Sequence, residues 1–82
     1  MSITLKEAIA NRIEELCKER GLNVNSLANI SGMERSTIYS IAGDKSKSPE
    51  VATIKKICDG LEITLAAFFN TDDFNNLEQE IK

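Results

Sequence analysis

The chain has 82 residues, of which 41% are hydrophobic and 5% aromatic, so its length supports one compact domain and argues against two independent cores. Ten Lys and Arg residues against thirteen Asp and Glu residues leave a formal net charge of −3, which by itself argues against a nucleic-acid partner. Histidine is absent, so the commonest general base and zinc ligand are missing. We therefore expect no enzyme, no metal site and no cofactor.

The two cysteines, Cys17 and Cys58, are too far apart for a Cys-x-x-Cys motif, and the chain shows no apolar signal-peptide core. We expect a cytoplasmic protein with buried, reduced thiols, and a redox role is the alternative. No apolar run approaches the roughly 18 residues of a membrane span, so we expect no membrane partner.

The first predicted helix begins at Thr4 and ends before Gly21. Thr4 and Glu7 match a capping box, in which a hydroxyl and a carboxylate each satisfy a backbone donor at the helix start. Glycine is typical of the residue that ends a helix in the left-handed conformation. The apolar stripe that should face the core comprises Leu5, Ile9, Ile13, Leu16 and Cys17.

Two short helices joined by a turn are predicted between Asn23 and Gly43. Asn23 suits the cap of the first helix, Gly32 forces the turn, and Ile38 and Ile41 lie three apart on one face of the second. The buried side of the first helix should comprise Leu27, Ala28 and, as a third candidate, Ile30. The second helix should carry a polar outer surface that includes Arg35, Ser36, Tyr39 and Ser40.

A loop from Gly43 to Lys47 should lead into a fourth helix, with Ser48 as its cap and Pro49 as its first residue. Thr64 should cap a fifth helix. The apolar residues of these two helices are Val51, Ile54, Ile57, Cys58, Leu61, Leu65, Phe68 and Phe69.

An acidic tail, residues 71–82, follows a predicted domain at residues 1–70. Phe74, Leu77 and Ile81 recur at spacings of three and four, so a sixth helix capped by Asp72 or Asp73 is an option. The fold class is all-α.

Residues 24–43 have the spacing of a helix-turn-helix motif. Positions on both sides of this motif follow a known pattern: Ile13, Leu16, Gly21, Leu22, Leu27, Ala28, Gly32, Arg35, Ser36, Thr37, Ile38, Ile41, Pro49, Thr53, Ile54, Ile57, Leu61, Ile63 and Phe69. On these residues, the segment from Arg12 to Phe69 resembles the Cro and lambda-repressor-like family, also called the XRE family. The resemblance implies a compact five-helix domain that places the second helix of the motif in the DNA major groove.

The resemblance implies that Arg35, Ser36 and Ser40 read bases, with Thr37 and Tyr39 close enough to touch a thymine methyl or a phosphate. Arg35 could donate two hydrogen bonds to guanine O6 and N7, and the alternative is a solvated arginine paired with Glu34 or another neighbouring carboxylate. Glu34 occupies the cap position of this helix. We expect its carboxylate to interact favourably with the positive end of the helix dipole. The alternative is that it accepts a hydrogen bond from a cytosine amino group.

Phosphate contacts should come from the start of the second helix, where backbone amides and small polar groups face outward. The candidates there are Asn23, Val24, Asn25 and Ser26. Lys45 and Lys47 should add charge from the following loop, unless they are simply solvated lysines. Val24 stands where the family usually has a glutamine, which removes one side-chain contact. Cys17 and Ala42 stand where it often has a paired arginine and glutamate, so we expect these two residues to pack together.

The functional prediction is a sequence-specific transcriptional regulator of the repressor type. It would bind double-stranded DNA as a homodimer on a near-palindromic operator with half-sites about 34 Å apart. The alternative is a protein-interaction module, such as an antitoxin or a partner-controlled regulator. Its contact set would be Phe68, Phe74, Leu77 and Ile81, unless these side chains only cover the domain's own core.

The distribution of charge weakens the initial argument against DNA. Residues 1–32 carry four basic and four acidic side chains, and residues 33–59 carry five and four. From residue 60 onward there is one basic side chain against five acidic ones. The negative charge is therefore concentrated in the tail, and the motif itself is mildly positive.

Overall fold

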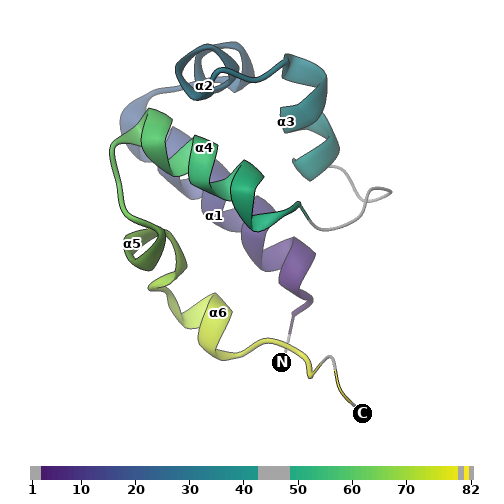
Figure 1. Cartoon of the computed structure of the whole chain (residues 1–82). Coiled ribbons are helices and arrows are strands. Elements are labelled where there is room, and N and C mark those ends of the chain that lie inside the picture. Colours follow the sequence, from purple (N-terminus) through teal and green to yellow (C-terminus); the bar gives the residue numbers. More distant parts are fainter. Residues whose placement is uncertain (1–2, 43–48, 80, 82) are drawn as a thin grey trace.

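The computed structural model describes residues 3–42, 49–79 and 81, and every regular element in these ranges is a helix (Figure 1). The predicted all-α fold with a short sixth helix is confirmed. The helices are α1 (Leu5–Arg20), α2 (Val24–Ser31), α3 (Arg35–Ala42), α4 (Val51–Leu61), α5 (Leu65–Phe69) and α6 (Asp72–Asn75).

Side-chain caps begin three of the helices, as the sequence predicts. At α1, the Thr4 hydroxyl and the Glu7 carboxylate form the expected capping box. Asn23 and Thr64 each accept a hydrogen bond from the backbone N–H of the third residue of the helix that follows, at 2.9 and 3.0 Å. Each cap satisfies a donor that has no helical partner and so defines where the helix starts.

Left-handed residues end three of the helices. Gly21 after α1 and Gly32 after α2 have φ values of 64° and 67°, as their predicted roles require. Gly32 thereby forms the tight turn of the helix-turn-helix motif. Glu62 after α4 has a φ of 59° and is the one non-glycine residue with positive φ in the described part of the chain.

Two of the predicted helix starts are wrong. Glu50 has an extended backbone and its carbonyl accepts from the first turn, so α4 begins at Val51 and Pro49 lies outside the helix. At α6 the capping position belongs to Thr71, which places Asp72 and Asp73 inside the first turn. Carboxylates are also favourable there, because they face the positive end of the helix dipole.

Ile30, the third candidate for the buried side of α2, is not part of the core. Its side chain is 44% exposed, whereas Leu27, Ala28 and Ser31 are buried. The three buried residues fall within about 100° of the helix circumference, because each residue turns the helix by about 100°, and Ile30 lies beyond the edge of that arc.

The apolar stripes of α1 to α5 meet in one core. Figure 1 shows α1 running behind α4, with α2 and α3 at one end and α5 and α6 at the other. The largest fully buried side chain is Phe68 of α5. The most extensive contact between two helices is that of α2 with α4.

Gly60 is the point where α4 meets the end of α2 backbone to backbone. A Cβ atom at Gly60 would lie 2.7 Å from the carbonyl oxygen of Ile30 and 2.9 Å from the Oγ of Ser31. Both distances are too short for real atoms, and the first neighbour is backbone that cannot rotate away. Any side chain at this position would therefore push α2 away from α4.

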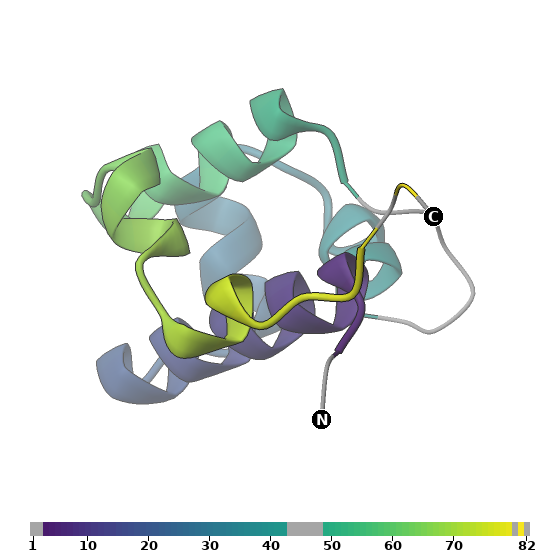
Figure 2. The same ribbon diagram turned by 90° about the horizontal axis from the view of Figure 1, so that it is seen from below.

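The C-terminal segment folds back onto the domain. Phe74 of α6 packs edge-on against Phe69, with ring centroids 4.8 Å apart. Beyond α6, the backbone N–H of Glu78 donates to the carbonyl of Ile3 at 3.0 Å, beside a parallel bridge between Ile3 and Leu77. Figure 2 shows this segment lying along the N-terminal part of α1. The domain boundary at residue 70 stays a prediction, but part of the following segment covers the core.

Replacing Gly60 by alanine should lower the free energy of unfolding by about 1–3 kcal/mol, because the added methyl group overpacks the contact between α2 and α4. In an uncrowded helix interior the same change would instead raise stability by about 0.5–1 kcal/mol. The sign of the measured change therefore shows whether the contact at Gly60 is crowded. Urea denaturation monitored by circular dichroism measures the difference.

The matched control is Glu62→Gly, two residues away. It introduces a glycine at an exposed left-handed position and should raise stability, because the strain at a β-carbon-bearing residue disappears. A Gly60→Ala variant as stable as the wild type would contradict the close-contact account.

Candidate nucleic-acid interface

Helix α3 buries one face and exposes the opposite one. Ile38 and Ile41 are only 2% and 4% exposed and anchor the helix to the core. Because each residue turns the helix by about 100°, the residues at positions 35, 36, 39 and 40 cover an arc opposite these anchors. The exposed side chains there are Arg35, Ser36, Tyr39 and Ser40, and Thr37 is half-buried beside them. The predicted polar outer surface is therefore confirmed, while its role in reading bases stays a prediction.

The first residues of α3 line a shallow hollow shared with α2. Its volume is about 540 Å³, and its lining residues are Asn25, Ala28, Asn29, Met33, Glu34 and Arg35. Asn29 was not among the sequence candidates, although its spacing of four from Asn25 places both amides on one helix face. The hollow brings the exposed side of α2 next to the start of α3.

Among the described residues that line this hollow, Glu34 and Arg35 are the charged ones. Neither side chain makes a hydrogen bond or an ion pair within the described residues. Within the described residues, Arg35 therefore pairs neither with Glu34 nor with another carboxylate. Glu34 lies directly before α3, as predicted, and its backbone carbonyl accepts from the N–H of Thr37 at 3.1 Å.

The start of α2 offers fewer free amides than the sequence suggests. The N–H of Ser26 donates to the side-chain oxygen of Asn23 at 2.9 Å and is thus used within the cap, while a phosphate contact through the Ser26 hydroxyl stays a prediction. Val24 and Asn25 are the first two helical residues, and their N–H groups have no helical acceptor. The side chain of Val24 packs against the core and leaves only its backbone for an external contact.

Three other predicted residues cannot be compared with the structure. Lys45, Lys47 and the side chain of Ala42 lie outside the described residues. The expected packing of Cys17 against Ala42 and the two lysine contacts remain predictions. Cys17 itself is half-buried.

The predicted partner surface is wrong for Phe68, whose side chain is fully buried inside this chain. Phe74 and Leu77 are half-buried, the first against the core and the second beside Ile3. Ile81 is 89% exposed and is the member of the set that is most available to a partner. Most of this set therefore covers the core, and capture by a partner protein stays a prediction.

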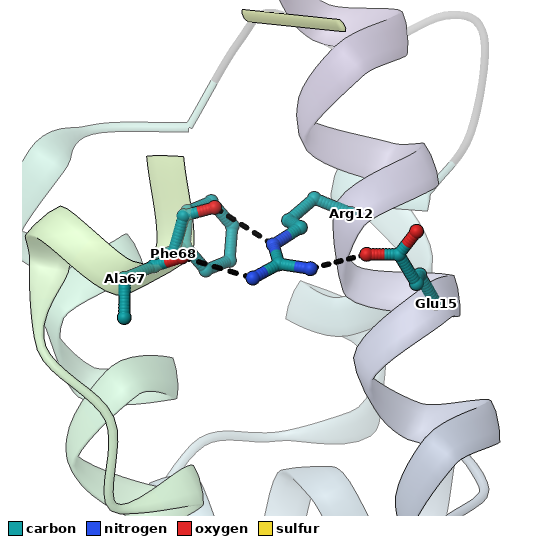
Figure 3. Close-up of polar contacts among 4 residues, drawn as sticks. All are labelled: Arg12, Glu15, Ala67 and Phe68. Atoms are coloured by element: carbon teal, nitrogen blue, oxygen red, sulfur yellow. Dashed lines mark hydrogen bonds and ion pairs between the residues drawn. The ribbon is translucent and has the colours of Figure 1, made fainter. Parts of the chain in front are cut away.

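Arg12 holds α5 in place and was missed as a structural residue. Its Nε donates to the carbonyl of Phe68 at 2.8 Å and its Nη2 to the carbonyl of Ala67 at 2.9 Å (Figure 3). Its Nη1 pairs with Glu15. The guanidinium thus satisfies the Phe68 carbonyl at the end of α5 and adds a second donor to the Ala67 carbonyl, which also accepts from the backbone N–H of Asn70 at 3.4 Å. In the sequence, this structural role is indicated by the position of a charged residue between the apolar residues of α1.

The described part of the chain contains neither a cluster of metal ligands nor a helix that could span a membrane. No three or more His, Cys, Asp or Glu side chains in residues 3–42, 49–79 and 81 lie close enough to hold a metal ion. None of the helices described is both long and apolar enough to cross a membrane.

Comparison with known proteins identifies related sequences and folds. Residues 12–73 match the profile of the Cro/C1-type HTH DNA-binding domain. Over 57 residues the chain is 39% identical to the HTH-type transcriptional repressor RghR of Bacillus subtilis (strain 168), and this alignment covers 70% of the chain and 42% of that protein. The chain therefore spans less than half the length of this relative.

Solved structures share the fold over most of the chain. Prophage Lp1 protein 11 superposes with a TM-score of 0.81 at 30% identity, over 94% of this chain and 100% of that one. An HTH_3 family transcriptional regulator from Vibrio cholerae superposes with a TM-score of 0.73 at 37% identity, over 83% of this chain and 38% of that one.

Burial makes both thiols poor nucleophiles at neutral pH. It raises the pKa of Cys17, and it is also the largest cause of the raised pKa of Cys58, where the nearby Lys55 acts in the opposite direction. At pH 7 iodoacetamide should therefore alkylate Cys17 slowly, and because its pKa is raised, the rate should rise only at pH values above the ordinary thiol pKa of about 8.5. Cys58 should react only when the chain unfolds.

Mass spectrometry of samples quenched over time measures both rates, and the chain in urea serves as the fully reactive control. Fast labelling of either thiol at pH 7, or of Cys58 ahead of Cys17, would contradict the expectation of inert, buried thiols.

Proposed function

The chain belongs to the Cro/C1-type helix-turn-helix DNA-binding family, also called the XRE family, and we propose that it is a sequence-specific transcriptional regulator that reads double-stranded DNA with α3. The observation that carries this proposal is the polar face of α3, which is exposed on a helix anchored by Ile38 and Ile41. A recognition helix requires this combination, because its apolar side must be fixed while its polar side reaches the base edges.

In the proposed complex the N-terminal end of α3 enters the major groove. Arg35 donates to O6 and N7 of a guanine, a contact that is worth about 1–3 kcal/mol of discrimination. Ser36 and Ser40 contact neighbouring bases, and Thr37 and Tyr39 contact a thymine methyl group or a phosphate. The lack of an ion pair at Arg35 within the described residues supports its role, since no contact with any of them has to break first.

Phosphate contacts position α3 along the duplex in this proposal. The backbone N–H groups of Val24 and Asn25 and the side-chain amide of Asn23 bind a phosphate at the positive end of α2. Lys45 and Lys47 add charge. Because the whole chain has a net charge of −3, affinity depends on these few local contacts and should fall steeply with salt.

We propose that two copies bind a near-palindromic operator with half-sites about 34 Å apart. One small domain buries too little area on DNA for tight binding, and pairing doubles the contact surface. The likeness to a Bacillus subtilis repressor supports repression as the outcome. Bacterial DNA lies in the cytoplasm, so the same likeness supports a cytoplasmic location.

Selection of bound duplexes from a random pool at low salt, followed by sequencing, tests the proposal. The wild-type chain should enrich a motif with two inverted half-sites, and sedimentation should show two chains per duplex. In the Arg35→Ala variant, the preference for guanine should disappear at one position in each half-site, which corresponds to about 1–3 kcal/mol of lost discrimination.

Lys56→Ala is the matched control, since it removes one positive charge from an exposed position of α4, outside the motif. Its selected motif should equal that of the wild type. An unchanged motif in Arg35→Ala would remove Arg35 from the reading surface, and the absence of any wild-type motif would refute sequence-specific binding.

A further inference from the structure

We propose that Glu34 and Arg35 act as a pair that reads cytosine and guanine in the same or neighbouring base pairs. Glu34 accepts a hydrogen bond from the N4 amino group of cytosine, while Arg35 donates to N7 and O6 of guanine. This inference rests on the proposed DNA-binding function and names part of the sequence that each half-site must contain.

The two side chains occupy the part of α3 that would lie deepest in the groove. Glu34 directly precedes the helix and Arg35 is its first residue, and both are exposed. Consecutive Cα atoms are about 3.8 Å apart, which is close to the rise of about 3.4 Å between base pairs. The pair can therefore address one base pair or two neighbours.

The carboxylate of Glu34 is not used as a helix cap. Thr4, Asn23 and Thr64 each precede a helix and accept a hydrogen bond from its third residue through the side chain. Glu34 has the same position but contributes only its backbone carbonyl, which accepts from Thr37. Its side-chain oxygens make no hydrogen bond within the described residues and are thus available as acceptors.

No neutralising contact accounts for Glu34 either. Of the described residues, neutral side chains of α2 and Met33 line the hollow around it, and Arg35, the cation among them, does not pair with it. A carboxylate facing DNA is repelled by phosphates, so it weakens binding unless it meets a hydrogen-bond donor. In the major groove the donors are cytosine N4 and adenine N6, but adenine also presents its N7 acceptor beside N6, which repels a carboxylate, as do thymine O4 and guanine O6. Cytosine is therefore the base that suits Glu34 best.

The two side chains therefore complement a cytosine–guanine edge. That edge presents one donor, on cytosine, beside two acceptors, on guanine, and the protein presents an acceptor beside donors. Arg35 alone would select guanine. Glu34 adds selection for cytosine and rejection of thymine at its own contact position.

The test is the selection experiment repeated with Glu34→Gln, which keeps the size of the side chain and removes its charge. The wild type should select cytosine next to, or paired with, the guanine assigned by Arg35→Ala. Glu34→Gln should lose at least about fivefold of that preference and accept adenine, since an amide bonds well to adenine N6 and N7. Its affinity for a non-specific duplex at low salt should equal or exceed that of the wild type.

Glu62→Gln is the control, because it removes the same charge from an exposed position at the end of α4. Its motif should match the wild type, and thermal melting should show that both variants stay folded. A wild-type motif without that cytosine, or a Glu34→Gln motif identical to the wild type, would overturn the inference while leaving DNA recognition intact. A wild type that selects no motif would refute the proposed function and the inference with it.

Discussion

The contact at Gly60 determines where the helix-turn-helix unit sits. At this residue the backbone of α4 comes so close to the end of α2 that no side chain fits between them. Helix α2 is thereby held against α4, and the left-handed Gly32 then fixes how α3 leaves α2. The exposed polar face of α3 depends on both glycines, since a displaced α2 would carry α3 with it. Protein interiors are close-packed, so they transmit such a shift rather than absorb it.

A second anchor fixes the opposite end of the domain. The buried ring of Phe68 and the Arg12 guanidinium hold α5 against α1, one through apolar packing and the other through hydrogen bonds to carbonyl groups. The segment after α5 adds Phe74 to the same cluster and reaches the N-terminal segment at Ile3. With these anchors the molecule separates into a scaffold of α1, α4, α5 and α6, and a motif that presents α3 outward.

Local signals in the sequence predicted most of the elements, because caps, left-handed glycines and helical periodicity act over three or four residues. Thr4, Asn23, Thr64 and Gly32 all have their expected roles. Contacts between distant residues could not be predicted in this way: Arg12 meets α5 more than fifty positions away, and nothing local marks Gly60 as a crossing point. The exposure of the α3 face could be predicted from periodicity. That Glu34 and Arg35 make no ion pair within the described residues could be learned only from the structure.

The central claim is that the chain binds DNA through the start of α2 and the exposed face of α3. Amide chemical-shift mapping by NMR, with a duplex selected by the wild-type chain, tests it most directly. The account predicts that the largest changes fall on residues 23–26 and 34–40, while α5 and α6 change little. Large changes confined to residues 65–79, with α3 unaffected, would contradict it and place the interface on the far end of the molecule.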